Sequence, residues 1–488
     1  MSVLSSLQTR LAALAAAVLL AASGAMAAGP ASELGPEVGT ATLEGAYVGQ
    51  LDLQPFRGAA GTAVTVTGSG FTPGESLDLV WNTVRGSWLI DGIEYHGRDY
   101  APVAYRIAGV TPDADGSFSA TFEAPEDFGF WHDVTLQEGG RLLNQAAFRV
   151  EMQVSISPES GPAGSPVTVD VSGIGWRQME NSWTLLYDNA FTGWMSSVTT
   201  GGHARFVIPA TGQPGTHVLE VIHGDFTFPY RNMQQSPEPD RPTFTATFEV
   251  TADAPVLPPA PEAQSQAVVA RLPAPGDITV EPAFGQVGQP FTASADGFAP
   301  GATATLYWST VTGNRVSGSG WETSEREIAQ AVADAQGRVS FTLATPDDLG
   351  GAHDLRIAGA DVGRTGSYWI APSALPLDVT SGPAGTPFEI HLKGVGWSET
   401  ANICTIVYDN GYIGYACGFN SQGDVVIPMH ATGAPGVHFI DLYPAIYKGT
   451  ETRPLNFRLP QLTYAEDHPG EDLPAFRFAF EVTGPDRE

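Results

Sequence analysis

Much of this sequence is an internal repeat, and that duplication limits what the chain can fold into. The motifs of residues 160–217 return in the same order at residues 381–438, at a constant offset of 221 positions. A second set of motifs, in residues 54–84, returns at residues 281–311 with an offset of 227 positions. The chain is therefore two copies of one long unit, and the first copy carries a short insertion between its two sets of motifs.

Each copy of the unit contains two related domains. Both domains open with a strand pattern, a Gly-x-x-Gly turn and a strand in which apolar and polar residues alternate, as in Val167-Thr-Val-Asp-Val171. Such alternation gives one buried and one wet face, as in an antiparallel sheet. Turn signals recur roughly every ten residues, which is typical of two-sheet sandwiches. The sequence therefore predicts an all-β fold of four tandem β-sandwich domains, arranged as a duplicated two-domain unit.

The expected boundaries follow from the repeats and from changes in composition. They are a signal peptide 1–27, a disordered leader 28–44, domain A 45–152, domain B 153–252, a Pro-rich linker 253–276, domain A′ 277–373 and domain B′ 374–484. The linker carries six prolines, so it is expected to be extended. Domains A and B follow each other almost directly. We therefore expect two stiff two-domain arms joined by a flexible spacer.

The N-terminus has the layout of a secretory signal. Arg10 precedes the apolar run Leu11–Ala22, and Ala25-Met-Ala27 offers a small-residue cleavage site. No later stretch is apolar over 18 or more residues, so no transmembrane segment is expected. The sequence predicts export, and it leaves the periplasm, the cell surface and the medium open as destinations.

The chain is strongly acidic. Its formal net charge is −30, from 53 acidic and 23 basic residues. Such a surface repels phosphate backbones, which excludes nucleic acid as an expected partner. The charge suits a soluble exported protein, divalent cations in the medium or a salty habitat, and the sequence does not separate these.

A resemblance adds to this interpretation. The pattern Gly-x-x-Gly-x-x-Val-x-Val-x-Gly-x-Gly-Phe-x-Pro-Gly at residues 58–74, Asp-Gly-Ser-Phe at 115–118 and Pro-Gly-Thr-His at 214–217 resemble the bacterial immunoglobulin-like repeats of exported and cell-surface proteins, including the IPT/TIG-like group. The resemblance covers nearly the whole mature chain, and its motifs are turn and core signatures. It implies immunoglobulin-like sandwiches and a role in adhesion, spacing or accessory binding, with no catalytic residues to transfer.

The two cysteines flank a predicted hairpin. Cys404 and Cys417 lie nearly symmetrically about Tyr408-Asp-Asn-Gly411, and Asn-Gly is a hairpin signal. In an oxidising compartment we expect a cross-strand disulfide. A two-cysteine metal site is the competing interpretation, but no His or Cys partner stands at ligand spacing.

One long connection in domain A concentrates aromatic and polar side chains. Residues 84–105 carry the insertion of the first copy, and Trp88, Tyr95, His96 and Tyr100 are its candidate binding residues. Aromatic residues on a long loop commonly contact partners or sugars. The alternative is that the connection folds over an open sheet edge. Domain B′ has a second insertion, Pro444–Leu473, which is rich in proline and aromatic residues.

Other candidate sites have structural explanations. Asp113 and Asp115 resemble the start of a calcium loop, but the second copy has Gln336 in place of Asp115. A hairpin turn is therefore favoured, and a looser surface Ca²⁺ site stays open. Four histidines also recur, each early in a strand, where a structural role is favoured: His132, His217, His353 and His438.

The function expected from these features is not enzymatic. No nucleophile elbow, zinc motif, phosphate loop or dinucleotide fingerprint occurs, and no catalytic residue, cofactor or metal ligand is assigned. We expect a cell-surface, adhesion or assembly module whose partner is a protein or glycan on a cell surface. The alternatives are a glycan-binding accessory protein and an extracellular hydrolase with an unrecognised acidic site.

Overall fold

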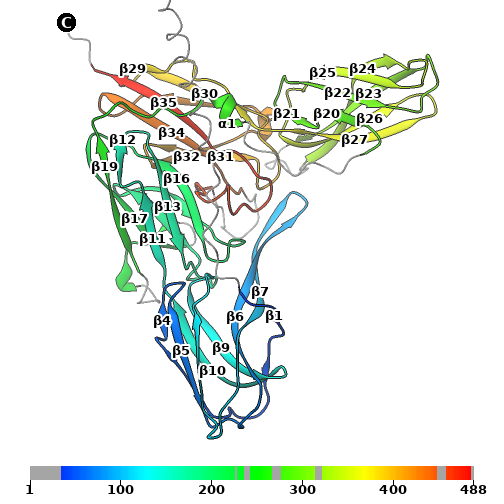
Figure 1. Cartoon of the computed structure of the whole chain (residues 1–488). Helices are drawn as coiled ribbons and strands as arrows, with labels where there is room; N and C mark the ends of the chain where they lie inside the picture. Colours follow the sequence, from blue (N-terminus) through cyan, green and yellow to red (C-terminus); the bar gives the residue numbers. More distant parts are fainter. Residues whose placement is uncertain are drawn as a thin grey trace, which may run out of the picture.

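The structure, a computed structural model, describes residues 34–225, 228–235, 242–265, 276–313, 321–447 and 458–484. It contains eight β-sheets, which pair into four sandwiches along the chain (Figure 1). The predicted all-β fold of four tandem sandwiches is confirmed. The predicted signal peptide 1–27 and the first residues of the leader lie outside the described residues.

All four domains share one plan, in which a three-stranded sheet faces a larger one. The three-stranded sheets are β3 (Gln50–Gln54), β5 (Ala63–Ser69) and β8 (Phe118–Glu123) in A; β11 (Gln153–Ser157), β13 (Pro166–Ser172) and β16 (Ala204–Pro209) in B; β20 (Thr279–Glu281), β22 (Pro290–Ala295) and β25 (Val339–Ala344) in A′; and β28 (Ser373–Ala374), β30 (Pro387–Lys393) and β33 (Val425–His430) in B′.

The larger sheets follow the same order in every domain, with a short parallel strand at one edge. They are β4 (Arg57–Gly58), β10 (Arg141–Val150), β9 (Phe130–Glu138), β6 (Leu77–Asp91) and β7 (Glu94–Val110) in A; β12 (Ser160–Pro162), β19 (Phe244–Thr251), β17 (Gly215–Asp225), β14 (Trp183–Tyr187) and β15 (Ala190–Met195) in B, with β18 (Phe228–Pro229) beside β17; β21 (Phe284–Gly285), β27 (Gly363–Ile370), β26 (Gly351–Ala358), β23 (Thr303–Gly313) and β24 (Trp321–Val332) in A′; and β29 (Ser381–Pro383), β35 (Phe476–Thr483), β34 (Gly436–Pro444), β31 (Ile403–Tyr408) and β32 (Gly411–Cys417) in B′.

The alternating strands build the cores. In β5 every second side chain is buried, including Val64 and Val66, and the side chains between them face solvent. In β13, Val167, Val169 and Val171 are fully buried in the same way. Burying a residue of this size stabilises the fold by roughly 1.5–3 kcal/mol. The period-2 pattern of the sequence therefore sets which face of each sheet becomes core.

The leader differs from expectation where the structure describes it. Within residues 34–44, β1 (Glu37–Val38) pairs with β7, and β2 (Thr42–Leu43) pairs with β10. The Arg85 side chain also donates a 2.6 Å hydrogen bond to Glu37. These residues supply backbone partners to the two outer strands of domain A, so this part of the leader is an ordered extension of the sheet.

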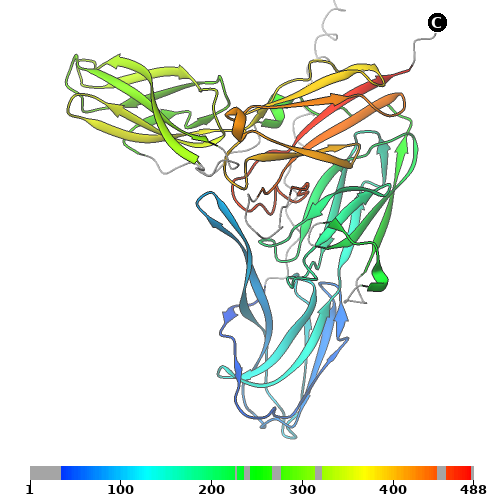
Figure 2. The ribbon, with the colours of Figure 1, turned by 180° about the vertical axis from the view of Figure 1, so that it is seen from behind.

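Domains B and B′ lie side by side, with A and A′ at the two ends (Figures 1 and 2). Strands β15 and β32, which are equivalent in the two copies, are in contact. Asn410 of B′ donates to the Pro209 carbonyl of B at 2.8 Å, and Thr192 donates to the Asn410 carbonyl at 2.7 Å. Three B′ side chains, Val407, Tyr443 and Leu462, pack into the core cluster of B.

The described part of the linker is held by both central domains. The backbone N–H of Val256 donates to Ala163 of domain B at 2.8 Å. In α1 (Pro261–Ser265), the side chain of Gln264 exchanges two hydrogen bonds with the backbone of Arg477 in domain B′. The expectation of two separate arms on a flexible spacer is therefore wrong, because the two copies pack against each other.

Candidate functional site

The long β6–β7 hairpin of domain A, which carries the predicted binding residues, reaches toward domain B′ (Figures 1 and 2). Trp88 Nε1 donates to Asp467 Oδ1 of B′ at 3.0 Å. Tyr95 is buried beside Trp194 of B and residues of B′, and burial raises the pKa of Tyr95 to about 12. Its backbone N–H donates to Glu399 of B′ at 2.8 Å. Two of the four candidates thus lie in a contact within the chain.

The other two candidates differ in exposure. The ring of Tyr100 meets Phe128 edge-on at 5.7 Å, and burial raises the pKa of Tyr100. His96 is exposed at the hairpin end, where Nε2 lies 3.6 Å from Glu94. A direct role of these four residues in binding an external partner stays a prediction, and only His96 has an exposed side chain.

Asp467 is the centre of the contact between A, B and B′. Its carboxylate accepts hydrogen bonds from the backbone N–H groups of Val198 and Thr199, from the Thr199 hydroxyl and from Trp88. Four donors from two other domains therefore converge on one side chain that is 1% exposed. We call this group the Asp467 clasp. Trp88 and Asp467 lie in the two insertions that the sequence shows, residues 84–105 and Pro444–Leu473. A single sequence does not show that two such insertions contact each other.

The recurring histidines have structural roles. The Nε2 atom of each one bonds to the carbonyl oxygen of the residue four positions earlier, at 2.7–2.8 Å: His132 to Phe128, His353 to Leu349, His217 to Gln213 and His438 to Ala434. In A and A′ the histidine also stacks on a buried tryptophan, with 4.5 Å between ring centroids. Each histidine therefore stabilises the turn that precedes its strand, which is the structural role that the sequence predicts.

The histidines of B and B′ have a carboxylate partner as well. His217 Nδ1 lies 2.6 Å from Asp188, and His438 Nδ1 bonds to Asp409 in the same position. The bond to Asp409 raises the pKa of His438. Burial opposes the charge of His217, yet its bonds to Gln213 and Asp188 raise its pKa overall. Both aspartates have positive φ, in Tyr187-Asp-Asn189 and in Tyr408-Asp-Asn-Gly411, and the hairpin turn predicted at the second motif is confirmed.

These raised pKa values predict that B and B′ lose stability as the pH rises above about 6.5. Because the folded pKa exceeds the unfolded value of about 6.5, the stabilisation is full below that pH and disappears as the pH rises through the folded pKa. We expect the melting temperature to fall over this range, and the fall to be smaller in the double variant His217→Asn/His438→Asn. The control is His430→Asn, an exposed histidine, which should keep the wild-type slope. An unchanged slope in the double variant would contradict the assignment.

In the turn at residues 113–117 of domain A, the two aspartate side chains bond to a backbone N–H of the same turn. Asp113 and Asp115 both accept from the N–H of Ser117 at 3.0 Å, and in A′ Asp334 accepts from Arg338 in the same way. The hairpin turn that the sequence favoured is thus present in both copies. Among the described residues no group of three or more His, Cys, Asp or Glu side chains is placed to hold a metal ion. Binding of Ca²⁺ at the surface stays a prediction.

The expected disulfide is absent from the structure, where Cys404 and Cys417 are not bonded to each other. Cys404 lies four residues before Tyr408, and Cys417 lies six residues after Gly411, which faces Tyr408. A bulge between Ile406 and Val407 takes up one of the two extra residues, so Cys404 faces Ala416 and Ile403 faces Cys417. A cross-strand disulfide needs the two residues to be suitably opposed. Burial raises the pKa of the Cys404 thiol to about 12, which disfavours the reactive thiolate.

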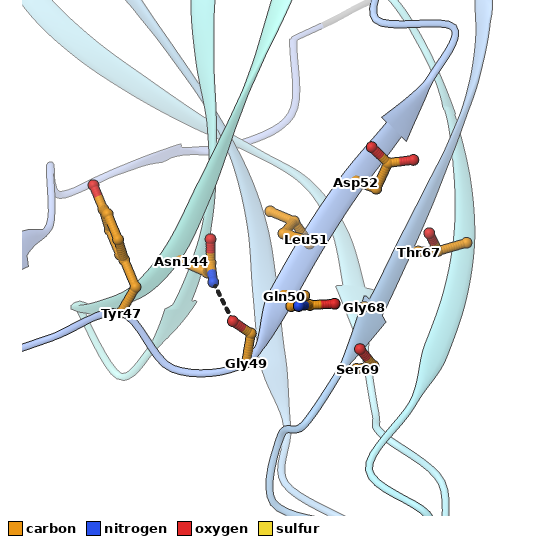
Figure 3. A pocket seen from close by; sticks show the side chains of 9 residues that line it. All are labelled: Tyr47, Gly49, Gln50, Leu51, Asp52, Thr67, Gly68, Ser69 and Asn144. Carbon is orange, nitrogen blue, oxygen red and sulfur yellow. Dashed lines mark hydrogen bonds between the residues drawn. The ribbon is translucent and has the colours of Figure 1, made fainter.

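A polar hollow of about 680 Å³ opens on domain A beside the end of the leader (Figure 3). Gln50 and Asp52 of β3 and Thr67 and Ser69 of β5 line it, and Asn144 donates to the Gly49 carbonyl at 3.0 Å. Asp52 is the one carboxylate in the lining, and it accepts from Gln54 at 3.2 Å. The hollow therefore lacks the pair of acidic groups that a glycosidase uses.

Two aromatic rings are exposed near the junction of domains A and B. Phe56 is 51% exposed and Trp131 is 39% exposed. Their planes are parallel within 4°, and their centroids are 6.5 Å apart. The Phe56 carbonyl accepts from the N–H of Arg149 at 2.9 Å, which fixes the chain beside β10. The two rings are therefore parallel to each other and partly exposed within one small area.

Three arginines surround these rings. The guanidinium of Arg57 lies 6.0 Å from the Phe56 centroid, and that of Arg149 lies 6.0 Å from the Trp131 centroid. Arg177 of domain B donates to the Trp131 carbonyl at 3.4 Å. We call these five residues the aromatic–arginine patch. Its members are up to 121 positions apart (56 to 177), so no local motif of the sequence indicates it.

Comparisons with known proteins do not assign the chain to a family. No family model and no curated protein matches it. Among solved structures, the chain is similar to invasin, described as a bacterial integrin-binding protein, with 11% identity over 89% of this chain and 79% of that one and a TM-score of 0.18. It is also similar to a putative membrane anchored protein from Corynebacterium diphtheriae, with 10% identity over 90% and 92% of the two chains and a TM-score of 0.18.

A third similar structure is a Salmonella alpha-2-macroglobulin, with 9% identity and a TM-score of 0.19; the match covers 90% of this chain but 31% of the macroglobulin. At these identities and TM-scores, none of the three likenesses carries an argument about function. Among the described residues no helix is long and apolar enough to cross a membrane.

Proposed function

We propose that this chain is an exported, non-enzymatic scaffold of immunoglobulin-like domains that acts at the cell surface in adhesion or assembly. The observation that carries the proposal is the bracing between the two copies, through the Asp467 clasp and the B–B′ contact. This bracing holds domains A, B and B′, and Gln422 of B′ donates to Asp348 of A′ at 2.7 Å. The outer surfaces of the four domains are thus held in one arrangement before any partner arrives. Preorganisation of this kind lowers the ordering cost of a contact that involves several surfaces at once.

The second candidate function is binding of glycans as an accessory protein. The aromatic–arginine patch favours it, because the patch combines two exposed aromatic rings with hydrogen-bond donors. The two functions are compatible, since an adhesive scaffold needs at least one surface that recognises its target.

Fractionation of producing cells tests the surface role. The medium, a surface wash with and without chelator, and the periplasm are blotted for this chain. We expect the chain in the surface fraction, and we expect a deletion strain to adhere several-fold less to its substratum or to other cells. Recovery of all the protein from the periplasm, with unchanged adhesion of the deletion strain, would overturn the proposal. Release by the chelator would show that divalent cations hold the chain to the surface.

A further inference from the structure

We propose that the aromatic–arginine patch is a binding site for acidic polysaccharides. The proposal rests on the proposed function, since it names the ligand class of a scaffold placed at the cell surface. The ring faces of Phe56 and Trp131 would pack on the apolar faces of sugar rings, and Arg57, Arg149 and Arg177 would bind the carboxylates along the polymer.

The patch is unusual for a chain of this composition. With a net charge of −30, the chain repels polyanions over most of its surface, yet three of its 23 basic residues gather at the two exposed rings. Arg57 lies 3.6 Å from Glu151, but both side chains are largely exposed, so this ion pair contributes little and can open for a ligand. Arginine binds carboxylates through two parallel hydrogen bonds, which suits a uronate group.

The duplication shows that the fold does not require these residues. In the first copy, Arg149 is the strand partner of both Arg57 and Trp131. At the same positions of the second copy, Trp369 is the strand partner of both Phe284 and Ala352. The N–H of Trp369 donates to Ala283, just as that of Arg149 donates to Phe56. The backbone contacts are therefore kept, while the exposed aromatic and basic side chains are found in the first copy alone.

The orientation of the rings favours a polysaccharide over an acidic protein. Two exposed rings held parallel within one small area suit a ligand that repeats flat apolar faces along its length. Protein hot spots also use tryptophan and arginine, but they typically fill pockets at the centre of a large interface. Acidic peptide is therefore the competing ligand in the test.

The test measures binding of the purified mature chain to alginate, a uronic acid polymer, with dextran as the neutral polymer and polyglutamate as the acidic peptide. We expect binding to alginate alone, weakened by raising the salt concentration because the arginine contacts are screened. Trp131→Ala, which installs the residue of the second copy, should weaken binding about tenfold or more. Arg57→Ala should weaken it several-fold and reduce the salt dependence.

Two control variants match these changes. Phe228→Ala removes an exposed ring, 55% accessible, from domain B, and Arg141→Ala removes an arginine from the far end of β10. Both should bind alginate as the wild type does, and melting curves should show that all variants are folded. Equal binding of alginate by Trp131→Ala, binding of polyglutamate as tight as that of alginate, or no binding by the wild type would each overturn the proposal. The surface role is tested separately by fractionation, so either idea can fail alone.

Discussion

Replacing Asp467 with asparagine is expected to detach the β6–β7 hairpin of domain A from domain B′. The amide would place an NH2 group where the carboxylate now accepts from Val198, Thr199 and Trp88. At least one buried donor would then face another donor, and hydrogen bonds to a charged group contribute roughly 1.5–3 kcal/mol each. We expect a loss of about 3 kcal/mol or more from this contact, since several such bonds weaken together.

Hydrogen exchange checks this result. In Asp467→Asn the amides at the hairpin end, residues 86–100, should exchange many times faster than in the wild type, because a hairpin without tertiary contacts is marginally stable. The matched control is Asp472→Asn, which changes a half-buried carboxylate of the same segment. Unchanged protection of the hairpin in Asp467→Asn would show that the clasp contributes little to the bracing.

Substituting alanine for Gly129 is expected to push domains A and B apart. The added Cβ would overlap the carbonyl oxygen of Gly173 in domain B, and backbone cannot move aside as a flexible side chain can. Gly129 also donates its N–H to Ile174 at 2.9 Å. Overpacking of this kind typically costs about 1–3 kcal/mol. The equivalent glycine of the second copy, Gly350, is packed against Gly394 and should behave alike.

Thermal unfolding and limited proteolysis measure this effect. Gly129→Ala should lower the melting temperature and open the junction, residues 150–153, to cleavage. Gly363→Ala is the control, because a Cβ there meets no atom within 4 Å. Wild-type resistance of the junction in Gly129→Ala would mean that the domains tolerate a looser contact than the structure indicates.

The sequence predicted the tandem β-sandwich fold well because the signals of strands and turns are local. Alternation such as that of Val64 and Val66 sets the faces of a strand, and Tyr408-Asp-Asn-Gly411 forms the predicted turn with positive φ at Asp409 and Asn410. The four recurring histidines were correctly interpreted as structural, since recurrence in both copies reflects a need of the shared fold.

The contacts between domains could not be predicted because they join distant residues. Trp88 and Asp467 are 379 positions apart, and no spacing rule connects them. The disulfide prediction was wrong because the two cysteines are not equidistant from the turn. Cys404 lies four residues before Tyr408 and Cys417 lies six residues after Gly411, and the bulge near Ile406 takes up only one of the two extra residues. The aromatic–arginine patch had a signal in the sequence, since aligning the two copies sets Trp131 against Ala352.

Small-angle X-ray scattering of the mature chain tests the braced arrangement most directly. The proposed function depends on four domains held as one body. A scattering profile that this single arrangement reproduces, and that Asp467→Asn shifts toward larger dimensions, is the predicted result. A wild-type profile that requires an ensemble of extended shapes, with the A–B and A′–B′ pairs moving independently, would contradict it.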